Sequence, residues 1–312
     1  MSAVHLTVAR TALITIAIIS GASCGGGKSG DMPTAPTPTT GSVPQASSAL
    51  PYGQATGGAA VPCPGGIGPP AGSTCSSLVV VCPSVASAVA TLRITRPAST
   101  ASNRGTLVLT TGAAGANFQD SVLTPGMIST LVGDGLVVVQ LAWDPPGIWG
   151  GPRARTLACR YATAAKWIYD NIHIGGKSRL FAAQGTSGGS AQIAFGLAHY
   201  GLSDLLDLAN LGGGPPGCPL CSPDGQNAPE PLLPAAAPAS NRDPLLAYPT
   251  TVVRFFLGSL EPTADIISDA NAFHNAVTTA KSFTIVPDTA HTIEGTQTGV
   301  DAYLAAVRAA LK

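Results

Sequence analysis

The serine best placed for nucleophilic chemistry is Ser187, in residues 185–189 (Gly-Thr-Ser-Gly-Gly). The same G-x-S-x-G spacing also occurs around Ser23, so the pattern alone does not identify a nucleophile. Ser187 differs because an apolar run precedes it and a small-residue run follows it, which predicts a strand, a sharp turn and a helix. Such a turn presents the hydroxyl at the positive end of the helix dipole. We predict Ser187 as a nucleophile. The alternative is a glycine-rich turn with an incidental serine.

A serine hydroxyl needs a base that removes its proton. Among five histidines, His291 is distinctive because it follows the last apolar run and precedes the last helical pattern. Parallel strands end at a common edge of a sheet, so His291 is expected at the edge that carries Ser187. The other histidines have ordinary explanations, in the leader or as buried or capping side chains of predicted helices: His5, His173, His199 and His274.

A third group must orient the imidazole and stabilise its charged form. Glu261 lies three residues beyond Gly258, close to the end of the preceding apolar run. Asp265 is the alternative acid, although its position just before a predicted helix also suits an N-cap. Asp207, on the strand before, is the remaining candidate. We predict Glu261.

The elements that must position these groups alternate along the chain. Continuous apolar runs of this kind are typical of strands buried on both faces of a parallel sheet, and alternation with helices predicts an α/β fold. The expected strands are residues 78–81, 89–94, 106–110, 136–141, 179–183, 205–211, 250–257 and 282–286. The expected helices are residues 153–172, 191–198, 266–278 and 300–310.

One segment interrupts the alternation. Residues 212–249 are rich in Pro, Gly and Ala, and a connection of this length predicts a lid or binding loop. Trp143 and Trp149 follow the strand at 136–141, where they either offer a substrate an apolar wall or close a loop over the core.

The order Ser187, Glu261, His291, each after a successive strand, resembles the α/β-hydrolase fold of serine esterases and lipases over about residues 76–312. The resemblance implies a mostly parallel sheet flanked by helices, with residues 212–249 where this family inserts its lid. It implies cleavage of carboxylic esters through an acyl-enzyme, with no metal and no cofactor. The backbone N–H groups of Gly188 and Ala113 would form the oxyanion hole. Two departures are the acidic residue, Glu rather than Asp, and residues 110–115 in place of the usual His-Gly.

The amino terminus predicts export. Residues 1–23 combine Arg10 with a short apolar run, the pattern of a signal peptide. Residues 20–24 resemble a bacterial lipobox, with Gly21 where an aliphatic residue is usual, so lipidation of Cys24 would anchor the chain to a membrane. Ordinary signal cleavage, which would release a secreted protein, is the alternative.

Two further segments complete the predicted organisation. Residues 24–72 are rich in Gly, Pro and Thr, which predicts a flexible tether before the hydrolase domain at 73–312. Six cysteines besides Cys24 favour disulfides in an exported chain, with the pairing open. Cys63, Cys75 and Cys82 lie close enough in the sequence to cross-link the start of the domain.

Charge restricts the partners. The 16 Lys and Arg residues balance 16 Asp and Glu residues, so no net field would attract nucleic acid. A neutral ester, small or polymeric, is the expected substrate. Two alternatives stay open: a non-catalytic binding lipoprotein on the same scaffold, and a peptidase or acyltransferase of the same fold.

Overall fold

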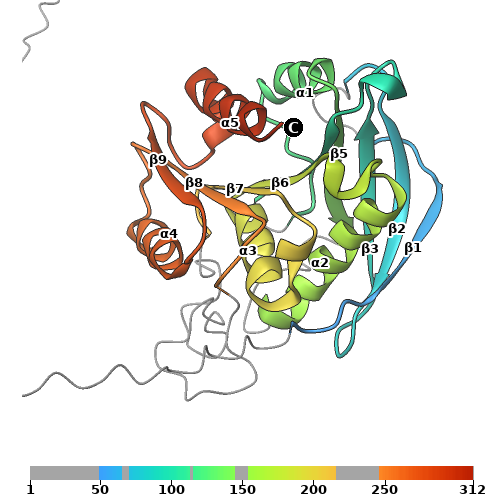
Figure 1. Ribbon diagram of the computed structural model, residues 1–312, viewed down its shortest axis with the longest axis horizontal. Helices are drawn as coiled ribbons and strands as arrows, with labels where there is room; N and C mark the ends of the chain where they lie inside the picture. Colours follow the sequence, from blue (N-terminus) through green and yellow to red (C-terminus); the bar gives the residue numbers. More distant parts are fainter. Residues whose placement is uncertain (1–48, 65–69, 113–114, 145–153, 216–245, 312) are drawn as a thin grey trace, which may run out of the picture. The chain divides into compact units, whose positions relative to one another are not determined.

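A nine-stranded sheet organises the chain, in the order β1-β2-β3-β5-β4-β6-β7-β8-β9. The computed structural model describes residues 49–64, 70–112, 115–144, 154–215 and 246–311. β1 to β3 form an antiparallel meander, and β3 pairs antiparallel with β5. The other six strands run parallel to one another. The α/β class predicted from the alternating pattern is therefore present (Figure 1).

The predicted helices and strands occur in the expected order with small shifts of their ends, and β1 and α1 are additional. The strands are β1 Gln54–Ala60, β2 Thr74–Val81, β3 Ala88–Thr95, β4 Gly105–Thr110, β5 Leu136–Asp144, β6 Leu180–Thr186, β7 Leu208–Gly212, β8 Val252–Gly258 and β9 Lys281–Val286. The α-helices are α1 Thr124–Gly133, α2 Ala154–Asn171, α3 Gly188–Tyr200, α4 Ala264–Ala276 and α5 Gln297–Ala310. Short 3-10 helices are η1 Thr100–Ser102, η2 Gly176–Ser178, η3 Leu202–Asp204 and η4 Ile293–Gly295.

Helices cover both faces of the sheet, α1 and α5 on one side and α2, α3 and α4 on the other (Figure 1). Successive side chains of a strand point to opposite faces of the sheet, so each central strand contributes to the hydrophobic core on both faces. In β5, Leu136 and Val138 belong to the cluster with α1 and α5, whereas Val137 and Val139 belong to the cluster with α2 and α3. Burial on both faces explains why the central strands are continuous apolar runs.

The tether prediction is wrong for part of residues 24–72. Gln54–Ala60 forms β1, an edge strand that pairs antiparallel with β2 from Gln54 opposite Val81. Its side chains are almost all exposed, so backbone pairing rather than a buried face makes it a strand. The helix α1 was not predicted either, and the strand expected over 205–211 starts only at Leu208, because η3 precedes it.

Two disulfides lie in the described residues, and one of them joins two of the three closely spaced cysteines, whereas the other reaches a distant helix. Cys63 bonds to Cys75 of β2, and Cys82, directly after β2, bonds to Cys159 of α2. Cys218 and Cys221 lie outside the described residues, as do Cys24 and nearly all of the 212–249 segment. Within the described ranges, no helix combines the length and apolar character that crossing a membrane requires.

Candidate active site

Ser187 occupies a sharp turn between β6 and α3, as predicted. Its backbone has φ 55° and ψ −122°, a conformation that costs a non-glycine residue roughly 1–3 kcal/mol. Two neighbouring glycines allow the turn: a methyl group at Gly185 would lie 2.5 Å from the backbone of Gly189, and one at Gly189 would lie 2.6 Å from the carbonyl oxygen of Thr110. The close approach of β6, α3 and β4 therefore holds the serine at the carboxyl end of β6.

His291 and Glu261 form a hydrogen-bonded pair at the same edge of the sheet. Nδ1 of His291 lies 2.7 Å from Oε2 of Glu261. The carboxylate side chain is 1% exposed and the imidazole is 31% exposed, so the acid is buried behind a histidine that reaches solvent. With the proton on Nδ1 donated to Glu261, Nε2 is left as an acceptor, which is the tautomer that a general base needs.

The loops that carry this pair are joined by backbone hydrogen bonds. Ser259 N donates to Val286 O and Leu260 N donates to Thr289 O, each at 2.9 Å. The carboxylate also accepts a hydrogen bond from Thr263 N at 3.2 Å. The loop after β8 is thus fixed to the loop after β9, and Glu261 is fixed within the first of them.

The other two acid candidates lie elsewhere. Asp265 is in the first turn of α4 and is exposed, while Thr263 occupies the N-cap position. Asp207 accepts a hydrogen bond from Phe181 N at 2.9 Å, next to the amino ends of β6 and β7, the opposite end of the strand from Ser187. The structure therefore pairs His291 with Glu261, the acid that the sequence favoured.

Ser187 and His291 contact two successive residues at the end of β7, Gly212 and Gly213 respectively. Ser187 N donates to Gly212 O at 2.8 Å. A methyl group at Gly213 would lie 3.2 Å from Cε1 of His291, so the imidazole packs against this glycine. Within the described part of the chain, no hydrogen bond joins Ser187 Oγ to the imidazole. In enzymes without substrate this bond is often long and shortens in the complex.

The loop after β4 begins beside the serine. A methyl group at Gly112 would lie 2.9 Å from Cβ of Ser187. Gly188, one predicted oxyanion donor, is the first residue of α3. Ala113, the other, lies outside the described residues. The loop that would supply the second donor thus starts in contact with the candidate nucleophile.

Trp143 supports this loop from within the core. It is 3% exposed, and its backbone N donates to Gly115 O at 2.8 Å. Its indole Nε1 donates to Gln192 Oε1 of α3 at 3.1 Å. Trp143 therefore fits the core interpretation rather than that of a substrate wall; Trp149 lies outside the described residues.

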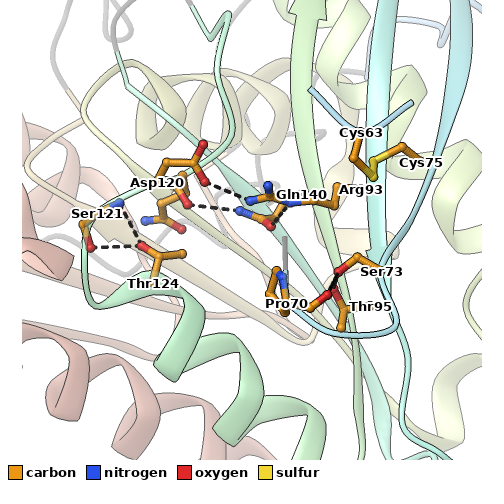
Figure 2. A network of polar contacts seen from close by, with 11 residues as sticks. Cys63, Pro70, Ser73, Cys75, Arg93, Thr95, Asp120, Ser121, Thr124 and Gln140 are labelled. Atoms are coloured by element: carbon orange, nitrogen blue, oxygen red, sulfur yellow. Dashed lines mark hydrogen bonds and ion pairs between the residues drawn. A yellow bond between two sulfur atoms is a disulfide. The ribbon is translucent and has the colours of Figure 1, made fainter. Parts of the chain in front are cut away.

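A buried arginine fixes the far part of the same loop (Figure 2). Arg93 of β3 donates from Nε to Gln140 Oε1 at 2.7 Å and from an Nη atom to Asp120 Oδ1 at 2.9 Å. Gln140 in turn donates to the carbonyl oxygen of Gln119 at 3.1 Å. The guanidinium is 2% exposed and stacks 4.2 Å from the centre of the Phe118 ring. The sheet thus holds Asp120 by a charge-assisted hydrogen bond, Gln119 by a neutral hydrogen bond and Phe118 by a cation–π contact.

Two polar residues next to the site were not singled out by sequence. Thr186, directly before Ser187, donates from Oγ1 to Oε2 of Glu294 at 2.6 Å. Glu294 is 4% exposed and lies three residues after His291. The sequence feature that could have identified Glu294 is its position in the loop of His291, because the chain has few acidic residues.

The other histidines have structural surroundings. His173 contacts Thr106 Oγ1 at 3.1 Å and Gly176 O at 2.9 Å. His199 of α3 is 5% exposed, and burial lowers its pKa to about 3. His274 of α4 packs against two phenylalanine rings. Across the described ranges, no three His, Cys, Asp or Glu side chains gather in a way that could hold a metal ion.

Strand order, parallel crossovers and a strand-to-helix serine turn together define the architecture. The chain has an α/β-hydrolase fold. No protein-family model and no curated protein matches the sequence. Several solved structures resemble the fold at low identity. The apo form of Thermogutta terrifontis esterase 2 is 16% identical, with a TM-score of 0.48 over 71% of this chain and 87% of that one. A dienelactone hydrolase from Anabaena variabilis is 16% identical, with a TM-score of 0.45 over 77% and 96%.

Proposed function

We propose that the chain is a serine hydrolase that cleaves carboxylic esters through an acyl-enzyme. The observation that carries this proposal is the Glu261–His291 hydrogen bond at the sheet edge where Ser187 is held at positive φ. A carboxylate-imidazole pair beside a strained serine turn is the arrangement that activates a serine hydroxyl.

The proposed reaction assigns each group one role. Ser187 Oγ attacks the ester carbonyl carbon, while Nε2 of His291 takes the hydroxyl proton and Glu261 stabilises the resulting imidazolium. The N–H groups of Gly188 and Ala113 hold the oxyanion, a contribution typically worth ~10²–10³ in rate for each donor. His291 then protonates the departing alcohol. In the second half, water attacks the acyl carbon as His291 removes its proton. His291 then returns this proton to Ser187 Oγ, and the carboxylic acid leaves.

The proposed substrate is a neutral ester, since the chain carries equal numbers of acidic and basic residues. We further propose export, with a lipid anchor on Cys24 when the lipobox is used and secretion when it is not. The two disulfides support export, because disulfides persist mainly in oxidising compartments.

The test compares the purified full chain with its Ser187→Ala variant on p-nitrophenyl acetate and butyrate. We expect a stoichiometric burst or steady turnover that falls by at least about 10³-fold in the variant. Covalent labelling by a fluorophosphonate should disappear as well. Ser129→Ala is the matched control, because Ser129 is an exposed residue of α1 whose hydroxyl contacts only Pro125 O among the described residues.

Three outcomes would contradict the proposal. Retained labelling of Ser187→Ala would remove the assigned nucleophile. A folded wild-type chain with neither labelling nor turnover would favour a non-catalytic binding protein. Faster turnover of amides, or acyl transfer to an alcohol in place of hydrolysis, would point to a peptidase or acyltransferase of the same fold.

A further inference from the structure

Glu294 is a buried acid that the proposed chemistry does not use. It belongs to the 3-10 helix η4 and is 4% exposed. Burial of a carboxylate is costly unless hydrogen bonds compensate it. Its Oε2 accepts a hydrogen bond from Thr186 Oγ1 at 2.6 Å, across 108 residues of sequence. The residue directly after Thr186 is the candidate nucleophile.

Glu294 connects the three segments that carry the site. Its side chain holds Thr186 and hence the entry to the Ser187 turn. Its backbone carbonyl accepts a hydrogen bond from Ser121 Oγ at 2.8 Å, in the loop between β4 and α1 that begins beside Ser187. Its own chain leads back, three residues earlier, to His291. Glu294 is therefore bonded to the segment before the nucleophile and to the oxyanion loop, and it lies in the same loop as the base.

The carboxylate of Glu294 determines which way the Thr186 hydroxyl points, because a hydroxyl directs its proton at its acceptor. Its single proton goes to the carboxylate, and its oxygen then faces Gln119 Nε2 and the Tyr303 hydroxyl, each at 3.4 Å. Burial and the nearby Glu294 charge raise the pKa of Tyr303 well above its usual value, so this hydroxyl stays protonated and can donate.

Tyr303 extends the contact to the backbone of the serine turn. A methyl group at Gly212 would overlap the Tyr303 hydroxyl, so the two are packed together. The carbonyl oxygen of Gly212 accepts the hydrogen bond from Ser187 N. The nucleophile is therefore supported on both sides by groups that converge on Thr186 and Glu294.

We propose that Glu294, acting through Thr186, is a positioning residue that holds Ser187 in register with His291 and the oxyanion loop. The proposal rests on the proposed function, because it requires Ser187 to be the nucleophile. A displacement of the order of 1 Å in a reacting group can cost about 10²-fold in rate. Loss of the carboxylate should hence lower the rate of the chemical step and leave ester binding nearly unchanged.

The experiment uses Glu294→Met, which keeps the length of the side chain and the backbone contact and removes the carboxylate to which Thr186 donates. We expect kcat for p-nitrophenyl butyrate to fall by about 10- to 100-fold with KM within about 2-fold. Fluorophosphonate labelling should slow by a similar factor, since it depends on the same attack. Thr186→Val should give the same loss, and Thr186→Ser, which keeps the hydroxyl, should restore most of it.

The double variant Glu294→Met/Thr186→Val shows whether the two residues act together. Residues in one hydrogen-bond network give non-additive losses, so we expect the double variant to be no slower than the slower single variant. Multiplied losses would overturn the proposal. So would wild-type kcat and labelling rate in Glu294→Met, whatever its melting temperature.

The two proposals fail in different ways. When wild-type protein is labelled at Ser187 but Glu294→Met is labelled equally fast, only the role of Glu294 is lost. When folded wild-type protein is not labelled at all, the proposed function itself is lost.

Discussion

The two halves of the sheet are held together by different means. In the antiparallel half, β1 to β3, both disulfides involve β2 or the residue after it, and the outer face exposes Val79, Val81 and Val89. In the parallel half, β4 to β9, the described loops at the carboxyl edge are joined by hydrogen bonds such as Glu261–His291 and Thr186–Glu294.

Because of this difference, we expect the disulfides to contribute to the free energy of unfolding and the loop hydrogen bonds to contribute to catalysis. A disulfide acts mainly by restricting the unfolded chain, and it sets few side-chain positions. Short hydrogen bonds to a buried carboxylate fix the position and proton of their partner. Removing the disulfides of the antiparallel half should therefore affect unfolding, and changes at the carboxyl edge of the parallel half should affect turnover.

The largest effect is expected from Glu261→Gln. An amide that donates to Nδ1 of His291 would place the imidazole proton on Nε2, where it cannot accept the Ser187 proton. We expect kcat to fall by about 10²–10⁴-fold, with the free energy of unfolding changed by less than about 1.5 kcal/mol. Steady-state kinetics and urea unfolding measure both.

Asp265→Asn is the matched control for that variant. Asp265 is exposed on α4, so kcat of the Asp265→Asn variant should stay within about 2-fold of the wild-type value. A larger loss from Asp265→Asn than from Glu261→Gln would transfer the role of acid to Asp265.

The parallel half was also the part of the fold that sequence predicted best. Its strands are buried on both faces, so β5 and β8 are continuous apolar runs that are easy to recognise. β1 was missed because an exposed edge strand of sequence Gln-Ala-Thr-Gly-Gly-Ala-Ala has neither alternation nor β-branched side chains beyond Thr56. The helix α1 was missed as well, since Pro125 and Gly126 near its start are typical of turns.

Some residues of the candidate site could be predicted from the sequence and others could not. Ser187, Glu261 and His291 each follow a strand, so the rule that parallel strands end at one edge predicts their proximity. Glu294 lies in the same loop after β9 as His291, but its contact with Thr186 joins residues 108 positions apart. No local pattern predicts such a contact, because it depends on how two loops pack in three dimensions.

The disulfides should give the next largest effect, on stability alone. Replacing Cys82 and Cys159 together by Ala opens a loop with a sequence separation of 77, which corresponds to about 4.5 kcal/mol of unfolding free energy. Replacing Cys63 and Cys75, at a separation of 12, should cost about 3 kcal/mol. In both variants kcat at a temperature well below unfolding should stay within about 2-fold. A large loss of kcat without a loss of stability would contradict the division between the two halves.

The smallest effect concerns pH and comes from His199 in α3, the helix that begins after Ser187. Burial first, and then the charge of Arg155, lowers its pKa to about 3, against 6.5 for an exposed histidine. Between these two values the unfolded chain binds a proton that the folded chain does not, so stability falls as pH decreases from 6.5 toward 3. At pH 5 this amounts to about 2 kcal/mol relative to pH 7.5.

His199→Leu isolates that contribution. Nε2 of His199 is buried without a hydrogen-bond partner in the described structure, so leucine removes no hydrogen bond at that atom. Urea unfolding at pH 7.5 and pH 5 should show a fall in stability that is about 2 kcal/mol smaller in the variant than in wild type. His173, whose pKa burial also lowers, is present in both proteins and cancels in the difference. An equal fall in the two proteins would mean that His199 is protonated in the folded chain at pH 5. Activity at pH 7.5 should stay close to wild type, since His199 lies at the end of α3 remote from Ser187.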